Sequence, residues 1–217
     1  MLTTERGFSL IETLVAMAAG VMVLATVLSL FIGQLASGNT HWQLSRLNQE
    51  VQGIADVLSR DIQRAGFHPA AVTEVALNRD PATAIAQHLV FSPAEDLYPS
   101  PSQASCIRLK FWDADAPAGE QLVVRIYDFQ ESTGVLRLHI HHNVQSRQPL
   151  SALCGLGNQL ISSKEIRVQA LSFTLTANSQ PQGTRSLALL LSGNYVNRPT
   201  LAQTLHRQIL LRNQGRG

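Results

Sequence analysis

The chain begins with a short polar stretch that leads into a long apolar run. Thr13 to Gly33 form 21 residues without a charged side chain. As an α-helix, such a run is roughly 30 Å long, about the thickness of the hydrocarbon core of a bilayer. No Asp, Glu, Lys or Arg occurs between Glu12 and Arg46. The pattern therefore predicts a transmembrane segment over residues 13–33.

After a polar patch at residues 37–40, the pattern changes to steps of three and four, which put apolar side chains on one face of a helix. This stripe comprises Leu44, Leu47, Val51, Ile54, Leu58 and Ile62, and the charged residues Arg46, Glu50, Asp56, Arg60, Asp61 and Arg64 are expected largely on the other faces. Gly66 and then Pro69 follow as stop signals. We expect one helix over residues 8–65, with a stripe that needs a cover.

The remainder of the chain has the short runs and turn residues of a β-sheet. Residues 66–105 are rich in Ala, Pro and Ser and are expected to be a connecting region with one short strand at His88–Ser92. Residues 106–217 are expected to form an antiparallel β domain, with strands at Cys106–Trp112, Gln121–Phe129, Gly134–His141, Glu165–Ala177, Ser186–Val196 and Thr204–Arg212. The predicted fold class is α+β, with the sheet packed on the helical stripe.

Two ordinary interpretations of the apolar segment fit poorly. A secretory signal peptide has an apolar core of 7–15 residues before a small-residue cleavage site, for which Ala36-Ser37-Gly38 is the candidate. The apolar core is too long for that, and Phe8 to Ile11 place further apolar residues before Glu12. A plain membrane anchor tolerates the length but leaves Glu12 unexplained, because an intramembrane carboxylate is costly and normally marks a function.

The stretch from Arg6 to Ala16, RGFSLIETLVA, resembles the N-terminal signature of type IV prepilins and of type II secretion pseudopilins. The resemblance implies that residues 1–7 are a leader, that prepilin peptidase cleaves between Gly7 and Phe8, and that the new Phe8 amine is N-methylated. It also implies a pilin-like fold and a role for Glu12, the fifth residue of the mature chain, in assembly.

Physical chemistry gives reasons for these residues. Gly7 lets the backbone adopt conformations that other residues disfavour at a narrow protease site. Cleavage creates an α-amino group that is mostly protonated at neutral pH. Either that amine or the Glu12 carboxylate alone is costly in apolar surroundings, so pairing of Glu12 with the Phe8 amine of a neighbouring subunit is expected to fix the assembly register.

Two short stretches point to a narrower group. Residues 61–67, DIQRAGF, and residues 208–213, QILLRN, resemble the corresponding parts of PilW-type minor pilins. The resemblance implies a structural subunit in the inner membrane with a periplasmic C-terminal domain. Its partners would be prepilin peptidase, other major and minor pilins and the pilus assembly platform. The related J pseudopilins of type II secretion remain an alternative, and a membrane-anchored periplasmic enzyme is the contrasting class.

Composition and cysteine count narrow the possible partners and the expected cross-links. Hydrophobic residues make up 45% of the chain and charged residues only 15%. From Lys164 to the end, the chain has seven basic residues and one acidic residue, Glu165. This mild basic excess predicts a solvent-exposed face. No nucleic-acid partner is expected. If the C-terminal part is exported, the two cysteines, Cys106 and Cys154, predict one disulfide. Two buried free thiols are the alternative.

The remaining candidate sites have weak signals. Asp113-Ala114-Asp115, followed by Gly119-Glu120, lacks the spacing of an EF-type calcium loop and predicts a polar hairpin turn. His139, His141 and His142 suggest a transition-metal site, but a solvated strand end is the preferred interpretation, so neither metal nor cofactor is expected. No nucleotide-binding glycine loop, HExxH or Gly-x-Ser-x-Gly motif is present, and the chain is not expected to be an enzyme.

Overall fold

The computed structural model describes residues 9–70, 89–142, 148–161, 164–177 and 185–213. These residues belong to two compact units, Met1–Arg46 and Leu47–Gly217. A single helix, α1 (Leu10–Arg64), runs through both units. Residues 10–46 of the helix, called here its first half, belong to the first unit. Residues 47–64, called its second half, contribute to the core of the second unit, and each unit is described in turn.

The predicted long helix is confirmed, and its end has a specific cause. Gly66 adopts φ +78°, the left-handed conformation in which helices commonly terminate. A Cβ at this position would lie 2.3 Å from the carbonyl oxygen of Asn213. The Asn213 side-chain amide donates to the free carbonyls of Gln63 (3.4 Å) and Ala65 (3.2 Å). The helix end and the end of the last strand are therefore packed directly on one another.

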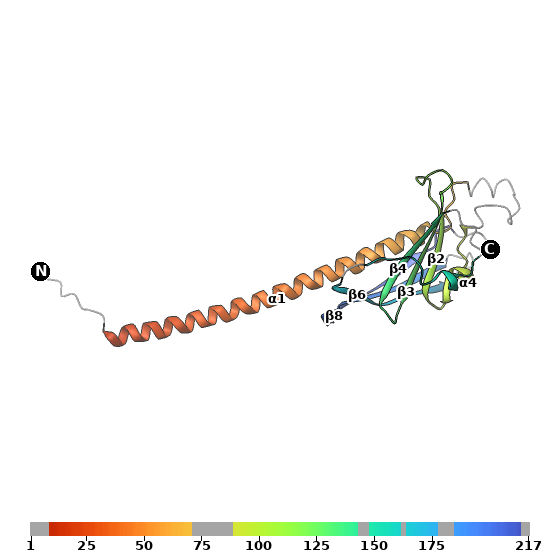
Figure 1. The fold of residues 1–217 in the computed structure, drawn as a ribbon. Helices are drawn as coiled ribbons and strands as arrows, with labels where there is room; N and C mark the ends of the chain where they lie inside the picture. The colour runs from red at the N-terminus through yellow and green to blue at the C-terminus, as the bar shows by residue number, and fades with distance from the viewer. Residues whose placement is uncertain (1–8, 71–88, 143–147, 162–163, 178–184, 214–217) are drawn as a thin grey trace. The chain divides into compact units, whose positions relative to one another are not determined.

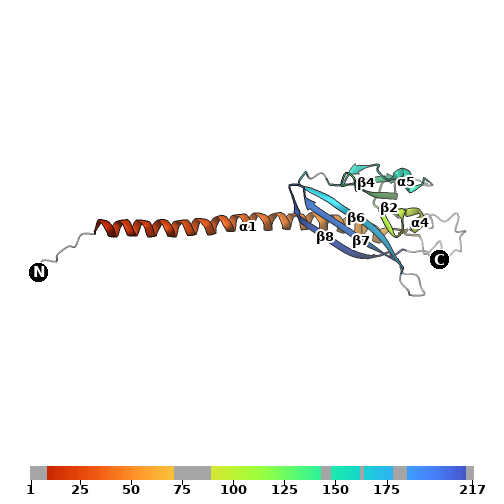
Figure 2. The same ribbon diagram turned by 90° about the horizontal axis from the view of Figure 1, so that it is seen from below.

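The predicted antiparallel sheet is also confirmed. Its long strands are β2 (Gln103–Trp112), β3 (Leu122–Gln130), β4 (Val135–His142), β6 (Ile166–Ala177), β7 (Arg185–Tyr195) and β8 (Arg198–Leu210). The strand order is β5-β4-β3-β2-β6-β7-β8, and all pairs are antiparallel. Figure 1 shows the strands beside the second half of α1, and Figure 2 shows β6, β7 and β8 next to one another.

The sheet consists of two parts that are joined narrowly. β2 pairs with β3 over seven positions, but its register with β6 contains the single pair Ala104–Phe173. The core bridges this joint. Five residues of the predicted stripe, from Leu47 to Ile62, are buried against apolar side chains of β2, β3 and β4 on one side and of β6, β7 and β8 on the other. The second half of α1 thus holds the two parts of the sheet together, which confirms that the stripe is covered by the sheet.

Four short elements were not predicted: α4 (Pro93–Asp96), β1 (Leu97–Ser100), α5 (Leu150–Leu153) and β5 (Asn158–Gln159). The prediction of a strand at His88–Ser92 is wrong: Leu89–Ser92 form no strand and lead into α4. His88 lies outside the described residues. The local cause is Asp96. Its fully buried carboxylate accepts hydrogen bonds from the Ser92 amide (2.8 Å) and Arg108 (2.7 Å), and Lys110 lies 3.0 Å away. This charge cluster fixes a segment whose sequence is typical of a connection.

Candidate functional site

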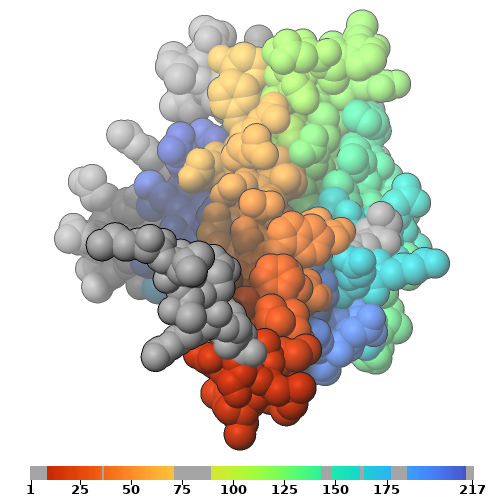
Figure 3. Space-filling model, turned by 90° about the vertical axis from the view of Figure 1, so that its left-hand side faces the viewer, coloured from red at the N-terminus to blue at the C-terminus, as the bar shows by residue number. Residues whose placement is uncertain are grey.

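The first unit presents a continuous apolar surface. Every Leu, Ile, Val, Met and Phe side chain from Leu10 to Leu35 is more than half exposed. The start of α1, drawn in red, lies toward the viewer in Figure 3. Among the described residues, α1 is the only helix long and apolar enough to cross a membrane. An exposed apolar surface of this extent indicates a membrane or a protein partner, so the helix fits a single-pass anchor.

Three hydroxyls of this half bond to the backbone of their own helix. The hydroxyls of Thr13, Thr26 and Ser29 donate to backbone carbonyls one turn earlier, at 2.9, 2.7 and 2.8 Å. Such bonds suit a helix in hydrocarbon, where water cannot satisfy polar groups. Glu12 lies in the first turn, where the helix dipole favours an acid. Within the described part of the chain its carboxylate has neither a hydrogen bond nor an ion pair, so it is open to a cationic partner.

The described part of the chain begins just after the other residues of the predicted N-terminal site. Gly7 and Phe8, the expected cleavage and methylation positions, lie outside the described residues. The described chain begins at Ser9, whose carbonyl accepts the amides of Glu12 (3.0 Å) and Thr13 (3.2 Å). The described helical backbone therefore starts at Leu10, two residues after Phe8.

Asp61 corrects one expectation about the second half of α1. The sequence pattern predicts a position largely off the stripe, but only 3% of Asp61 is exposed. Its carboxylate accepts two hydrogen bonds from Arg125 Nη1 (2.9 and 2.8 Å) and one from the Tyr127 hydroxyl. Burial and the Asp61 charge raise the pKa of Tyr127, which therefore stays a donor at neutral pH. Burial opposes the charge of Arg125, but Asp61 outweighs it and raises its pKa. This cluster ties the helix to β3.

The expected disulfide between Cys106 and Cys154 is present, with the two Cα atoms 6.2 Å apart. Cys106 is fully buried in β2, and Cys154 follows α5. The bond closes a small second core on the sheet face that bears α5, where Leu150 and Leu153 pack on Val124 and Ile126. The disulfide therefore fastens α5 to the sheet on the side away from the α1 core.

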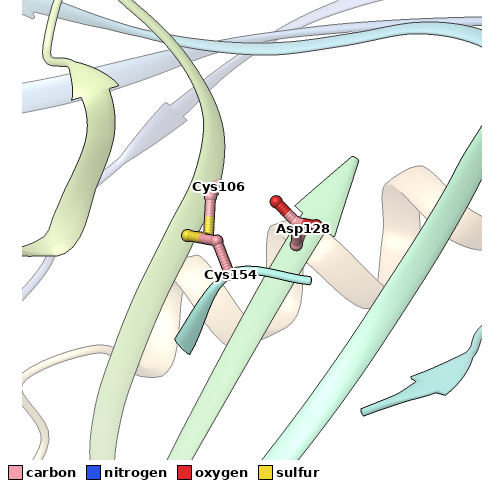
Figure 4. Close-up of side chains that lie close together, drawn as sticks. All are labelled: Cys106, Asp128 and Cys154. Atoms are coloured by element: carbon pink, nitrogen blue, oxygen red, sulfur yellow. A yellow bond between two sulfur atoms is a disulfide. The ribbon is translucent and has the colours of Figure 1, made fainter. Parts of the chain in front are cut away.

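Asp128, which the sequence did not single out, lies beside this disulfide. One of its carboxylate oxygens and the two sulfurs lie within 4.8 Å of one another (Figure 4). Burial raises its pKa, against the opposing effects of the Gly155 amide and Arg137. The amide of Gly155 donates to Asp128 Oδ2 at 2.9 Å. Because both sulfurs are bonded to each other, no thiolate is present for a metal. The carboxylate instead fixes the turn that carries Cys154.

The loop between β2 and β3 is the predicted polar hairpin turn. The Asp113 amide donates to the Gln121 carbonyl (2.7 Å), and Gly119 adopts φ +90°. The Asp113 carboxylate accepts the amide of Asp115 (3.3 Å) and lies 3.6 Å from Arg64. The Asp113 carboxylate thus contacts both the turn and the helix end.

The histidines of β4 differ from the expected solvated strand end. His139 and His141 are half-buried, their ring centroids lie 3.8 Å apart, and the rings are nearly perpendicular. Burial, and then the proximity of His141, lower the pKa of His139. His142 faces the other way and remains exposed, with Nδ1 3.1 Å from the Glu120 carbonyl. The pair His139 and His141 is therefore a partly enclosed imidazole cluster.

The helix and the sheet together define a class of protein. A long apolar N-terminal helix whose second half forms the core of an antiparallel sheet is a pilin-like architecture. A family model described as prepilin peptidase-dependent protein B matches residues 40–211, which is most of the chain, and the chain belongs to this family. Searches of curated proteins and of solved structures found no match. The matched range begins after the apolar run, so the family match and the signature at residues 6–16 are separate observations.

We predict that removal of the disulfide destabilises the second unit without affecting the N-terminal segment. The sequence separation of 48 corresponds to roughly 4 kcal/mol of loop-closure entropy. A Cys106→Ala, Cys154→Ala double variant should lose stability of this order in denaturant unfolding of the full chain in mild detergent. Wild type in reductant, which keeps both side chains, is the matched control and should lose a similar amount. Equal unfolding midpoints for the oxidised, reduced and double-variant proteins would contradict the prediction.

Proposed function

We propose that this chain is a minor pilin of PilW type, a structural subunit that is assembled through α1 into a type IV pilus or its initiation complex. The observation that carries the proposal is the exposed apolar half of α1 with Glu12 in its first turn. The Glu12 carboxylate has no partner among the residues that the structure describes. A membrane covers the apolar side chains but offers no cation at that depth. A neighbouring subunit with a charged N-terminal amine satisfies both requirements.

The proposed maturation follows from the same segment. Prepilin peptidase removes residues 1–7, and the Phe8 amine so created is N-methylated. Membership in a family named for its dependence on prepilin peptidase supports this step. After cleavage, the amine lies two residues before the start of α1 at Leu10, on the helix that carries Glu12. One helix terminus therefore offers a cation to one neighbour and an anion to another.

The narrower assignment is supported by the contact at the helix end. The two stretches that resemble PilW-type pilins, residues 61–67 and 208–213, are far apart in sequence. In the fold they meet, because Gly66 packs on Asn213 and the Asn213 amide caps α1. Asp61, in the first stretch, forms the buried pair with Arg125. Both stretches that resemble PilW-type pilins therefore lie at one contact, where the C-terminal end of α1 packs on the sheet.

The proposed location is the inner membrane of a Gram-negative bacterium, with the second unit in the periplasm. The disulfide suits an oxidising compartment. The proposed partners are other major and minor pilins and the pilus assembly platform, and the role is non-catalytic. A J pseudopilin of type II secretion would use the same helix and the same maturation. Neighbouring genes for pilins, or for a secretion channel, distinguish the two.

The first test is the mature N-terminus. We predict that the intact mass of the protein corresponds to a chain that begins at Phe8 with one added methyl group. The full-length mass should be found in a strain that lacks prepilin peptidase. A Gly7→Val variant should stay uncleaved, because the bulky residue disfavours the backbone conformation at the cut, whereas Ser9→Ala should be cleaved normally. A mature chain that begins near Asn39 would instead favour a secretory signal peptide.

The second test concerns Glu12. We predict that Glu12→Ala and Glu12→Val leave membrane insertion intact, since they remove an insertion cost of up to about 3 kcal/mol. Their recovery in sheared filaments should nevertheless fall strongly, because a neighbour's amine loses its partner. Quantitative immunoblots of membrane and sheared fractions measure both quantities, with Thr13→Ala as the adjacent control. Recovery of the Glu12 variants in filaments at the wild-type level would refute the register role.

A further inference from the structure

The imidazole pair of β4 lies on the sheet face that bears α5. In the antiparallel register, His139 is opposite Ile126 and His141 is opposite Val124. Residues opposite one another in such a pair share a face of the sheet. Ile126 and Val124 belong to the small core that is closed by α5 and the disulfide. The two histidines therefore project to the same side as that core, away from α1.

The chain that follows α5 encloses His139. A Cβ added at Gly157, which has φ +90°, would lie 2.8 Å from both Cα and Cβ of His139. The Gly157 carbonyl accepts a hydrogen bond from Arg137 (3.3 Å), and β5 pairs with β4 immediately beside it. The disulfide at Cys154 holds this segment in place. The turn at Gly157 therefore packs against His139, and β5 and the disulfide keep this turn in place.

The two rings each bring a buried, unpaired nitrogen to this place. Nε2 of His139 and Nε2 of His141 are inaccessible to solvent and have no hydrogen-bond partner in the part of the chain that the structure describes. A buried polar atom without a partner is costly, and such atoms commonly mark a bound water or ion. Two of them on rings 3.8 Å apart form a pair that one small ligand satisfies together.

The chemistry of the pair selects the ligand. Neutral imidazole nitrogen is a preferred ligand of divalent transition metals, with Cu²⁺ bound most tightly in the usual affinity order. The imidazole χ2 torsion is broad, so the ring orientations are less restricted than those of an sp³–sp³ torsion. The cation on the same face of β4 is Arg137, two residues before His139. Its guanidinium donates to the Gly157 carbonyl (3.3 Å), and its charge also acts on Asp128, where it opposes the rise in pKa that burial causes.

We propose that His139 and His141 form a two-histidine binding site for a divalent transition metal, Cu²⁺ above Zn²⁺, beneath the turn that follows α5. The site lies in the second unit and is independent of the proposed assembly role of Glu12. Because the turn is fastened by the Cys106–Cys154 disulfide, metal binding is expected to depend on the oxidised protein.

The experiment uses the full chain in mild detergent, purified without a histidine tag, stripped with a chelator and kept oxidised. Calorimetric titration with Cu²⁺ and with Zn²⁺ is compared for wild type, His139→Gln, His141→Gln and the double variant. His142→Gln, on the opposite face of the same strand, and His206→Gln, in β8, are the controls. Electron paramagnetic resonance of the Cu²⁺-loaded protein counts the bound nitrogens.

We expect one tight equivalent of Cu²⁺ with two nitrogen ligands in wild type and in both controls. Each single variant should lose about tenfold or more in affinity, and the double variant should lose the site. Cu²⁺ should also raise the unfolding midpoint of wild type but not of the double variant. Should the Gln variants fail to fold, His139→Leu and His141→Leu replace the unpaired imidazoles with apolar groups that the small core tolerates.

Two results would overturn the proposal. One is Cu²⁺ binding by the double variant as tight as that of wild type, which would place the metal on other residues. The other is a wild-type protein that binds no metal and shows no change in unfolding midpoint, which would assign the space between the rings to water.

Discussion

The rest of the structure depends on the packing of the second half of α1 against the sheet. β2 meets β6 at the single register pair Ala104–Phe173, so backbone hydrogen bonds alone join the two parts of the sheet weakly. The buried stripe from Leu47 to Ile62 bridges them. Asp61 fixes the position of α1 along the sheet. Its buried carboxylate needs hydrogen bonds from Arg125 and Tyr127, and both donors are within reach in only one position of the helix. A sliding or rotated helix would leave that charge unpaired.

Because α1 is fixed in this way, its two halves have different surroundings. Its second half is covered by the chain's own sheet, and its first half is covered by nothing within the first unit. The hydroxyls of Thr13, Thr26 and Ser29 are bonded to their own helix, whereas the Glu12 carboxylate has no partner among the described residues. On the far side of the sheet, the disulfide and Asp128 fasten the α5 segment. The core under α1 and the small core under α5 are thus stabilised by different interactions on opposite faces of the sheet.

Much of this arrangement was predictable from periodicity. The stripe, the long strands and the stop at Gly66 follow from local spacing and turn chemistry, and the cysteine pair follows from count and compartment. Asp61 was misplaced because spacing alone cannot show that a buried acid has partners 64 and 66 residues away. Asp128, α4 and the enclosed histidines depend on register and on the path of the chain across the sheet. These long-range contacts leave no local pattern.

The central claim is that the exposed half of α1 docks on the N-terminus of another pilin-like subunit. Val15 lies one turn after Glu12 and is exposed, so it shares the face of that carboxylate. A photoreactive amino acid at this position should, in cells with prepilin peptidase, form a covalent adduct that mass spectrometry maps to the first residues of a second, processed subunit. Adducts with lipid alone, in cells that assemble filaments normally, would contradict the account.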